Sequence, residues 1–257
     1  MTNPLARTVL RLLALLVLAL AALAPAARAE LYFDGKNRFV MEGVRMRLPI
    51  TNQAVHPALL HLSLDWGDEA SQAPLPLALS RPLLKLLAGQ QAHVDVFYQG
   101  EGLPTDRESY LLLRILDVPQ APHADNTMQL ALRHHFKLFY RPPLPTTREQ
   151  AWASLSWERS GDGDTPVLLA RNPSPYYLTL GHLEVLDAGG QPCGEPREHL
   201  MIAPYSSQSL PAPGCHAAQL RYQLISDAGN PHAREFTLST SGHDATASRP
   251  ALPEKQP

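Results

Sequence analysis

The stretch that decides the fold begins with Met128-Gln-Leu-Ala-Leu-Arg133 and continues, after two histidines, with Phe136-Lys-Leu-Phe-Tyr-Arg-Pro142. In its first part apolar and polar residues alternate, so that an extended chain places Met128, Leu130 and Leu132 on one face and the polar residues on the other. A period of two is typical of a half-buried β-strand. This is the clearest strand that the sequence predicts.

Similar strand patterns recur on both sides of this stretch. Before it we expect strands at 38–41, 44–50, 59–64, 93–98 and 110–116. After it we expect strands at 153–157, 166–170, 176–180, 182–186, 219–225 and 235–239. Pro49 inside one of them indicates a sheet edge or a bulge, and residues 83–87 could form no more than a short helical turn.

Three prolines between Arg141 and Thr146 form a stiff connector that divides the chain into two halves. Each half has about 100 residues and six or seven expected strands, which is the size and rhythm of an immunoglobulin-like sandwich. We therefore expect an all-β protein. Its two β-sandwich domains would span 30–146 and 147–241, followed by a disordered tail at 242–257 that is rich in Ser, Ala, Pro and charge.

The first 29 residues have the organisation of a secretory signal peptide. Arg7 and Arg11 precede a run of Leu, Ala and Val at 12–24, and a small-residue pattern ends at Ala29, after which we expect cleavage. The alternative is a membrane anchor, but a thirteen-residue run is short of the roughly 20 residues that cross a bilayer. The sequence thus predicts an exported protein.

The overall charge excludes some classes of function. The chain has 22 basic and 24 acidic residues and a formal net charge of −2, which argues against the broad basic surface of a nucleic-acid binder. Hydrophobic residues make up 44% and charged residues 18%, so most of the chain is expected to fold.

Catalytic and metal-binding motifs are absent from the sequence. It contains no Gly-x-Ser-x-Gly elbow, glycine-rich phosphate loop or His-Glu-x-x-His helix. His134 and His135 are neighbours on an expected strand, so they point to opposite faces and cannot chelate one ion together. A hydrolytic carboxylate pair stays an alternative, with the candidates Asp95, Asp106, Glu108 and Asp117, although nothing in the sequence brings two of them together. We expect no enzyme and no metal site.

The two cysteines, Cys193 and Cys215, lie in the second half of the chain. In an oxidising compartment such a pair most often forms a disulfide, which would stabilise the fold by about 3 kcal/mol. The alternative is two independent thiols. Either way the role is structural, because there is no Cys-x-x-Cys redox motif.

Four segments, in the same order, resemble the periplasmic chaperones of chaperone–usher pili, the family of the P-pilus chaperone. The resemblance covers residues 38–239. The matching segments are Asn37-Arg-Phe-Val before Gly43, Leu103-Pro-Thr-Asp-Arg-Glu-Ser109, Phe136-Lys-Leu-Phe-Tyr-Arg-Pro142 and Asn172-Pro-Ser-Pro-Tyr-Tyr-Leu-Thr-Leu180.

The resemblance implies an L-shaped pair of immunoglobulin-like domains that lends a strand to a pilus subunit, which lacks one of its own. By this resemblance Met128, Leu130 and Leu132 fill the groove of the subunit. The alternative is that their alternation only faces the domain's own core. The short segment 119–126 resembles the short-loop branch of the family, which serves rod-like pili with tip adhesins.

The resemblance also implies roles for five charged residues. Arg38 and Lys137 match the two cleft residues that bind the C-terminal carboxylate of the subunit. The residues Glu108, Arg141 and Asp227 match a charge triad that fixes the angle between the domains. The alternative for all five is an ordinary solvated surface charge, which stabilises a protein by only about 0–1 kcal/mol per pair.

The partners implied are pilus subunits in the periplasm and an outer-membrane usher, with no cofactor and no ATP. A free molecule could also cover its exposed donor strand by forming a homodimer. Two other classes of function stay open. One is a structural or adhesive immunoglobulin-like binding module, and the other is a periplasmic carbohydrate-acting enzyme.

Overall fold

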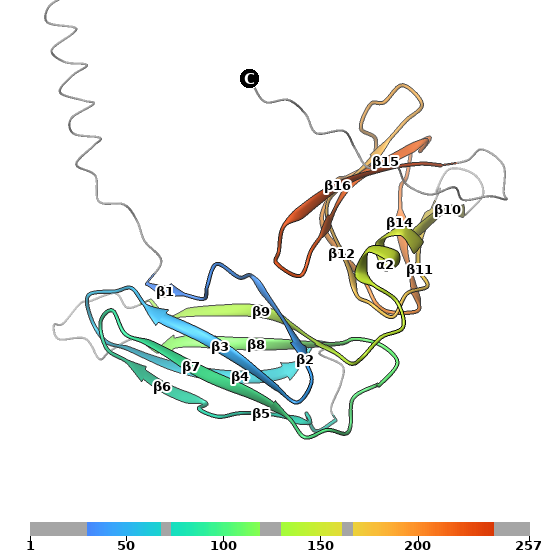
Figure 1. The fold of residues 1–257 in the computed structure, drawn as a ribbon. Coiled ribbons are helices and arrows are strands. Elements are labelled where there is room, and N and C mark those ends of the chain that lie inside the picture. Colours follow the sequence, from blue (N-terminus) through green and yellow to red (C-terminus); the bar gives the residue numbers. More distant parts are fainter. Residues whose placement is uncertain (1–29, 68–72, 119–129, 161–166, 239–257) are drawn as a thin grey trace, which may run out of the picture.

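The structure, a computed structural model, describes residues 30–67, 73–118, 130–160 and 167–238 (Figure 1). The predicted signal peptide, the tail at 242–257, the short segment 119–126 and Met128 lie outside the described residues. Strands gather into four sheets, which enclose two separate hydrophobic cores. No helix in the described ranges has the length and hydropathy needed to cross a bilayer.

The first domain is a sandwich of two sheets. One sheet has the order β1 (Leu31–Tyr32), β3 (Arg45–Asn52), β7 (Gln91–Tyr98) and β5 (Leu77–Leu79). The other has the order β2 (Arg38–Glu42), β9 (Leu132–Arg141), β8 (Ser109–Val118), β4 (Ala58–Trp66) and β6 (Leu83–Leu86). Alternate residues of each strand enter the core, as Leu111, Leu113 and Ile115 of β8 do. The first sandwich is thus formed by strands in which every second side chain faces the shared core.

Strand β9 has two different faces. Phe136, Leu138 and Tyr140 point into the core of the first domain and are buried. The residues between them, Lys137 and Phe139, point to the opposite face, because side chains alternate along a strand. One strand therefore contributes both to the core and to the surface that meets the second domain.

The second domain is a smaller sandwich that begins with a short helix. Helix α2 (Arg148–Ser154) is capped by Thr147 and Gln150, whose side chains and backbone amides bond reciprocally. One sheet has the order β10 (Ser156–Ser160), β11 (Val167–Asn172) and β14 (Ser206–Pro211). The other has the order β13 (Arg197–Ile202), β12 (Leu178–Leu186), β15 (Gln219–Ile225) and β16 (Pro231–Thr237).

Several local predictions need correction or refinement. The clearest expected strand, 128–133, begins as β9 only at Leu132, because residues 130 and 131 are not in a strand and Met128 lies outside the described residues. The expected strand at 153–157 starts only at Ser156, because α2 occupies the preceding residues. Residues 83–87, which could have formed at most a short helical turn, contain strand β6 (Leu83–Leu86) instead. Pro49 is edge-like, as predicted, because β1 pairs with β3 only at Thr51 and Asn52 and leaves Pro49 uncovered on that side.

The two cysteines are joined in the structure. Cys193 and Cys215 form a disulfide with a Cα–Cα distance of 5.3 Å. The bond ties the segment before β13 to the segment before β15, and Cys215 is buried in the core of the second domain. It therefore links two chain segments of the same sandwich.

The two sandwiches lie at an angle to each other and are connected by the short segment between β9 and α2 (Figure 1). The outer face of β2 and β9 and the hairpin between β15 and β16 lie at this junction. The backbone amide of Glu108 also donates a hydrogen bond of 2.9 Å to the carbonyl of Pro175 across it. The inner corner of the L is thus built from β2, β9, β12 and the β15–β16 hairpin.

Candidate functional site

Two cations sit side by side at the inner corner. β2 pairs with β9 in parallel, and in this register Arg38 and Lys137 are direct Cα partners. Their neighbours Phe39 and Leu138 enter the core, so both cations are on the face that points away from it. The parallel register, which local sequence cannot reveal, is what places them together.

Arg38 is deeply buried for an arginine, with 6% of its surface exposed. One guanidinium nitrogen donates a hydrogen bond of 3.5 Å to the hydroxyl of Thr179 in the second domain, and the group lies 6.0 Å from the ring centroid of Phe139. Its Nε has no partner among the described residues. Burial and the positive charge of Arg148 lower the pKa of Arg38. Such a buried donor favours an anion that could satisfy it.

Lys137 is half-buried beside it and contacts Nε2 of His199 from β13. Burial and the charge of Arg38 lower the pKa of Lys137 to about 8. Burial, Lys137 and Arg38 likewise lower the pKa of His199. In the described part of the chain, no carboxylate forms an ion pair with Arg38, Lys137 or His199.

The chemistry of the corner suits an anion. Two cations converge without a neutralising carboxylate, and repulsion and burial make their charged forms costly. A single carboxylate between them would offset that cost by charge-assisted hydrogen bonds. Asp227 and Glu108 act on Arg38 only through longer-range attraction.

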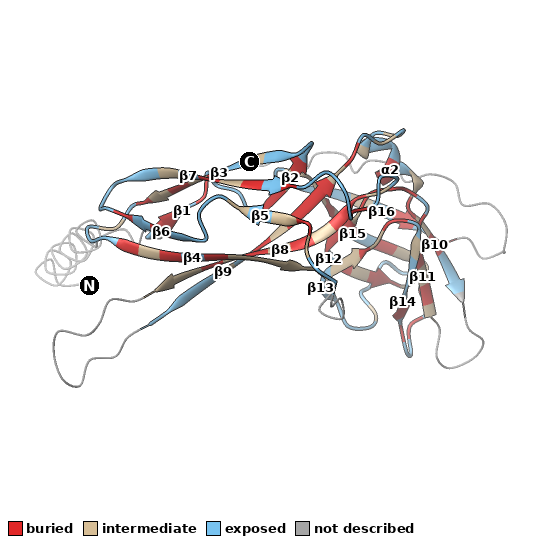
Figure 2. Ribbon diagram, turned by 90° about the horizontal axis from the view of Figure 1, so that it is seen from below, coloured by how far each residue is buried: buried red, intermediate tan, exposed pale blue. Residues whose placement is uncertain are grey.

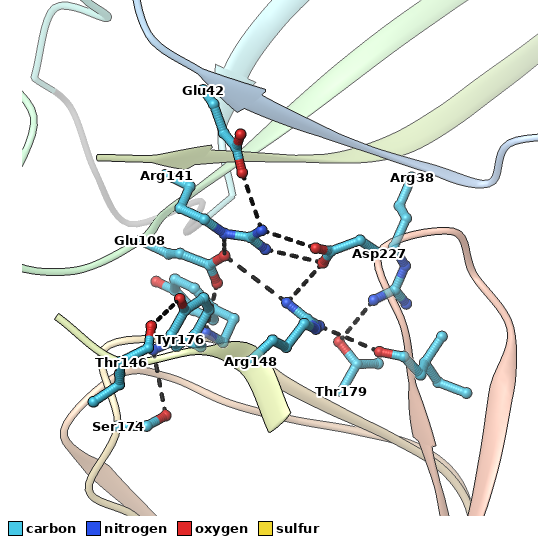
Figure 3. Close-up of polar contacts among 12 residues, drawn as sticks. Arg38, Glu42, Glu108, Arg141, Thr146, Arg148, Ser174, Tyr176, Thr179 and Asp227 are labelled. Carbon is cyan, nitrogen blue, oxygen red and sulfur yellow. Dashed lines mark hydrogen bonds and ion pairs between the residues drawn. The ribbon is translucent and has the colours of Figure 1, made fainter. Parts of the chain in front are cut away.

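A network of charges bridges the domains next to this site (Figure 3). Arg141 of β9 donates from Nε to Glu108 at 2.7 Å, and its two other nitrogens donate to the Asp227 carboxylate at 2.8 and 2.9 Å. Glu108 also accepts the backbone amide of Tyr177 at 2.8 Å. Glu108 and Arg141 belong to the first domain and Asp227 to the second, so the triad spans the junction.

The network is larger than the triad that the resemblance implied. Arg148 of α2 lies 2.7 Å from Asp227 and 3.9 Å from Glu108, and Glu42 lies 3.3 Å from Arg141. The sequence did not identify Arg148, because its pattern predicted a strand at 153–157 and no helix before it. Thr179 and His199 were likewise not predicted, since each reaches the site from the second domain.

The acids of this network differ in their surroundings. Burial raises the pKa of Glu108, whose side chain is 0% exposed, although Arg141 opposes this effect. Burial acts to raise the pKa of Asp227 as well, but the hydrogen bonds from Arg141 and the charge of Arg148 lower it below its usual range. Asp227 is therefore held ionised, as a bridging role requires.

Three aromatic rings fill the space between the charges. The rings of Tyr110, Phe139 and Tyr177 have centroid separations of 5.5, 5.8 and 5.6 Å, and Tyr177 belongs to the second domain. This contact is apolar and couples β8 and β9 to the second sandwich. The junction is thus both charged and packed.

The N-terminal part of β9 leaves the sandwich with an open edge. β2 covers β9 only from Lys137 to Arg141, and no other described strand pairs with 132–136 on that side. Leu130 and Leu132 have the parity of the core residues but are 71% and 53% exposed, as the pale blue end of β9 in Figure 2 shows. An exposed apolar row beside unpaired backbone groups can pair with another chain.

The other candidates of the sequence do not form a second site. Asp95 pairs with Arg45 at 2.8 Å and Asp106 with Arg107 at 2.8 Å, whereas Glu108 pairs with Arg141 at 2.7 Å. His134 packs against Phe33 with ring centroids 5.1 Å apart. Within the described ranges no group of three or more His, Cys, Asp or Glu residues could hold a metal ion.

Comparisons with known proteins agree on one family. The N-terminal domain profile described as a pili and flagellar-assembly chaperone matches residues 40–145, and the C-terminal domain profile of the pili assembly chaperone PapD matches 150–236. The chain is 34% identical to chaperone protein FimB/FhaD of Bordetella pertussis, over 82% of this chain and 88% of that protein. It is 31% identical to the probable fimbrial chaperone YadV of Escherichia coli, over 73% and 80%.

Solved structures show the same likeness. The YadV chaperone superposes with a TM-score of 0.67 at 26% identity, covering 82% of this chain and all of that one. The SafB chaperone of Salmonella enterica, solved in complex with the SafA pilin, gives a TM-score of 0.66 at 27% identity and covers 83% and 99%.

Proposed function

The chain belongs to the PapD family of pilus assembly chaperones, and on that premise we propose that its inner corner and the open edge of β9 together hold one pilus subunit. The family consists of chaperones rather than enzymes, and its members act in the periplasm. Their general role is to stabilise pilus subunits and deliver them to an outer-membrane usher.

The observation that carries the proposal is the pair Arg38 and Lys137, adjacent in register and without a carboxylate partner in the described chain. In this proposal they bind the C-terminal carboxylate of the subunit. The open edge of β9 starts at the same point and runs to Leu132, about 17 Å away for five residues of strand. A chain anchored at the cations would therefore lie along that edge.

Anchoring and strand pairing have complementary tasks. The unpaired backbone groups of 132–136 offer hydrogen bonds to an added strand. Leu130 and Leu132, with Met128 beyond the described residues, would fill the groove of the subunit. Because a slip of one residue would turn every side chain to the wrong face, a fixed carboxylate sets the register of the pairing.

The charge network has an orienting task in this proposal. Glu108, Arg141 and Asp227 would hold the domains at the angle that lets both contact the subunit. Thr179 of the second domain supports this task because it binds Arg38. The site therefore depends on both domains.

Residues 1–29 would be the export signal, with cleavage after Ala29. Support comes from the basic start, the short apolar run and the small residues of the sequence. The mass of the intact protein isolated from the periplasm tests this. A mature chain that starts at Glu30 is expected, and a retained leader would contradict it.

The function is tested by the partners that the protein retains. Tagged protein from the periplasm of its native host is compared with the double variant R38A/K137A. A matched control, R47A/K85A, removes two exposed cations far from the corner. Pilus subunits are expected with the wild type and the control and should be lost from R38A/K137A. Subunits retained equally by all three would contradict the anchor, and a wild type without any pilin-like partner would favour an immunoglobulin-like binding module.

A further inference from the structure

His199 of β13 contacts Lys137 across the domain junction. The anchor proposed above consists only of Arg38 and Lys137 and gives His199 no role. His199 is the pairing partner of Gly181 in β12, two residues from Thr179, which binds Arg38. The alternate residues Leu200 and Ile202 turn toward the core of the second domain. His199 therefore lies on the outer face of its sheet, the face that Thr179 presents to the first domain.

The protonation states of this contact are set by simple chemistry. The Lys137 ammonium has only donors, so it can bond to Nε2 of His199 only when that nitrogen is unprotonated and accepts. The neutral imidazole then carries its proton on Nδ1. If both groups were charged, they would repel each other at contact distance.

The surroundings of His199 contain cations but no paired acid. Lys137 and Arg38 face it from the first domain, and both oppose its protonation. On its own strand, Glu198 is engaged with His182 at 2.8 Å. Arg197 lies two residues before His199 on β13, and Arg148, Asp227 and Glu108 act on the neighbouring Arg38.

We propose that His199 is a third residue of the carboxylate site: it accepts a hydrogen bond from Lys137 in the free chaperone and donates one to the carboxylate of the bound subunit. The inference rests on the proposed carboxylate anchor. On binding, the imidazole takes one proton from solvent, the carboxylate stays ionised and no covalent bond changes. Lys137 is then released to donate to the carboxylate as well.

The proton uptake gives the site a pH dependence with a definite sign. In the free protein burial and the two cations lower the pKa of His199, whereas a bound carboxylate would raise it again. Because the complex binds one more proton than the free protein, the affinity rises as the pH falls from the pKa of His199 in the complex to its pKa in the free protein. The titration of Lys137, whose pKa is about 8, weakens binding separately on the alkaline side.

The experiment compares two synthetic peptides in which Val and Thr alternate, one with a free C-terminal carboxylate and one with a terminal amide. Affinities are measured by calorimetry from pH 5.5 to 9. Proton uptake is measured at pH 6.5 in two buffers of different ionisation enthalpy. The variant H199Q keeps a side chain that can both accept and donate but cannot titrate. The control is H61Q, which changes an exposed histidine of β4.

For the wild type and H61Q we expect the free acid to bind more tightly than the amide, and its affinity to rise about fivefold from pH 7.5 to 5.5 with uptake of a proton. H199Q should keep the preference for the acid and lose the acidic rise and the uptake. If H199Q keeps the acidic rise, the role of His199 is overturned while the anchor stands. If acid and amide bind alike, or neither binds, the anchor fails and His199 with it.

Discussion

At the scale of single residues, the proposed anchor consists of two cations that the fold keeps apart from acidic partners. Arg38 and Lys137 are covered by the second domain, which makes their charged forms costly, yet no described carboxylate neutralises them. Longer-range attraction by Asp227 and Glu108 offsets part of this cost at Arg38. An anion that enters the corner recovers part of the cost.

The first prediction concerns Lys137. Since a bound carboxylate favours its charged form, the contribution of Lys137 to the affinity for the free-acid peptide should be full below pH 8. It should be lost as the pH rises above about 8, the pKa of Lys137 in the free protein. Calorimetry between pH 7 and 10 measures this. The variant K137R, whose guanidinium stays charged, should lose the alkaline decline. A decline that persists in K137R would assign the titration to another group.

The second prediction concerns Gly229 in the β15–β16 turn. Its φ is +87°, and a Cβ there would lie 2.4 Å from the side-chain oxygen of Asn37 in the first domain. G229A should therefore lower the unfolding temperature and loosen the junction. G190A is the matched control, because Gly190 has a φ of +76° and open space around it. We expect G229A to cost about 1 kcal/mol more than G190A, and equal costs would contradict a close interdomain contact.

At the scale of elements, β9 combines three tasks along ten residues. Its C-terminal half is paired on both edges and carries core residues, cleft residues and Arg141. Its N-terminal half keeps one edge open and turns apolar side chains to solvent. The same period of two serves the domain's own core at one end and, in the proposed function, a partner at the other.

The third prediction separates these two ends. L130S/L132S should abolish retention of pilus subunits but change the free energy of unfolding by less than about 0.5 kcal/mol, since both side chains are exposed. L138A, at a buried position of the same strand and parity, should cost about 2–5 kcal/mol. Pull-down and denaturant unfolding measure both effects. Strong destabilisation by L130S/L132S would mean that these leucines serve the domain's own core.

The exposed end of β9 also supports the expectation of a self-capping homodimer. Wild-type protein should show concentration-dependent association in sedimentation, and L130S/L132S should reduce it. A strict monomer at high concentration would contradict self-capping without affecting the subunit site.

The fourth prediction concerns the disulfide between the segments that precede β13 and β15. Replacing Cys193 and Cys215 by alanine should destabilise the second domain by about 3 kcal/mol, because the bond closes a loop with a sequence separation of 22. The first domain, which has its own core, should keep its stability. Hydrogen exchange resolves the two domains, and uniform loss of protection in both would contradict this separation.

At the scale of the whole molecule, the angle of the L is held by charges and rings from both domains. Arg141 and Arg148 converge on Glu108 and Asp227, while Tyr110, Phe139 and Tyr177 pack beside them. The proposed subunit site uses residues of both domains, so its geometry would depend on this angle. A change that frees the interdomain angle should therefore weaken subunit binding, as removal of the site residues would.

The fifth prediction tests this coupling. E108A leaves Arg141 without its buried partner and should cost about 3–5 kcal/mol in the stability of the junction. It should also widen the distribution of interdomain angles in small-angle scattering and weaken subunit retention. E158A, which breaks an exposed pair with Arg171 at 3.0 Å, is the control and should change little. Unchanged scattering and retention in E108A would show that the network does not set the angle.

The sequence by itself determined most of the longer strands, the all-β class and the family, because alternation, turns and contiguous motifs are local properties of the chain. It missed the shorter or less regular strands β1, β5, β6, β13 and β14. It also singled out Arg38, Lys137, Glu108 and Arg141, which lie within the matching segments, and Asp227, which matches the third member of the family's triad. It failed at α2, where capping by Thr147 and Gln150 outweighed the strand-like pattern that follows.

Only the tertiary structure decided what surrounds these residues. The parallel register of β2 and β9 places Arg38 beside Lys137, and the domain junction brings in Thr179, His199 and Arg148. Thr179 is 141 residues from Arg38, and His199 is 62 residues from Lys137. No local pattern encodes such pairs. These residues come close together, and burial shifts their pKa values, only after both cores have packed and the two domains are in contact.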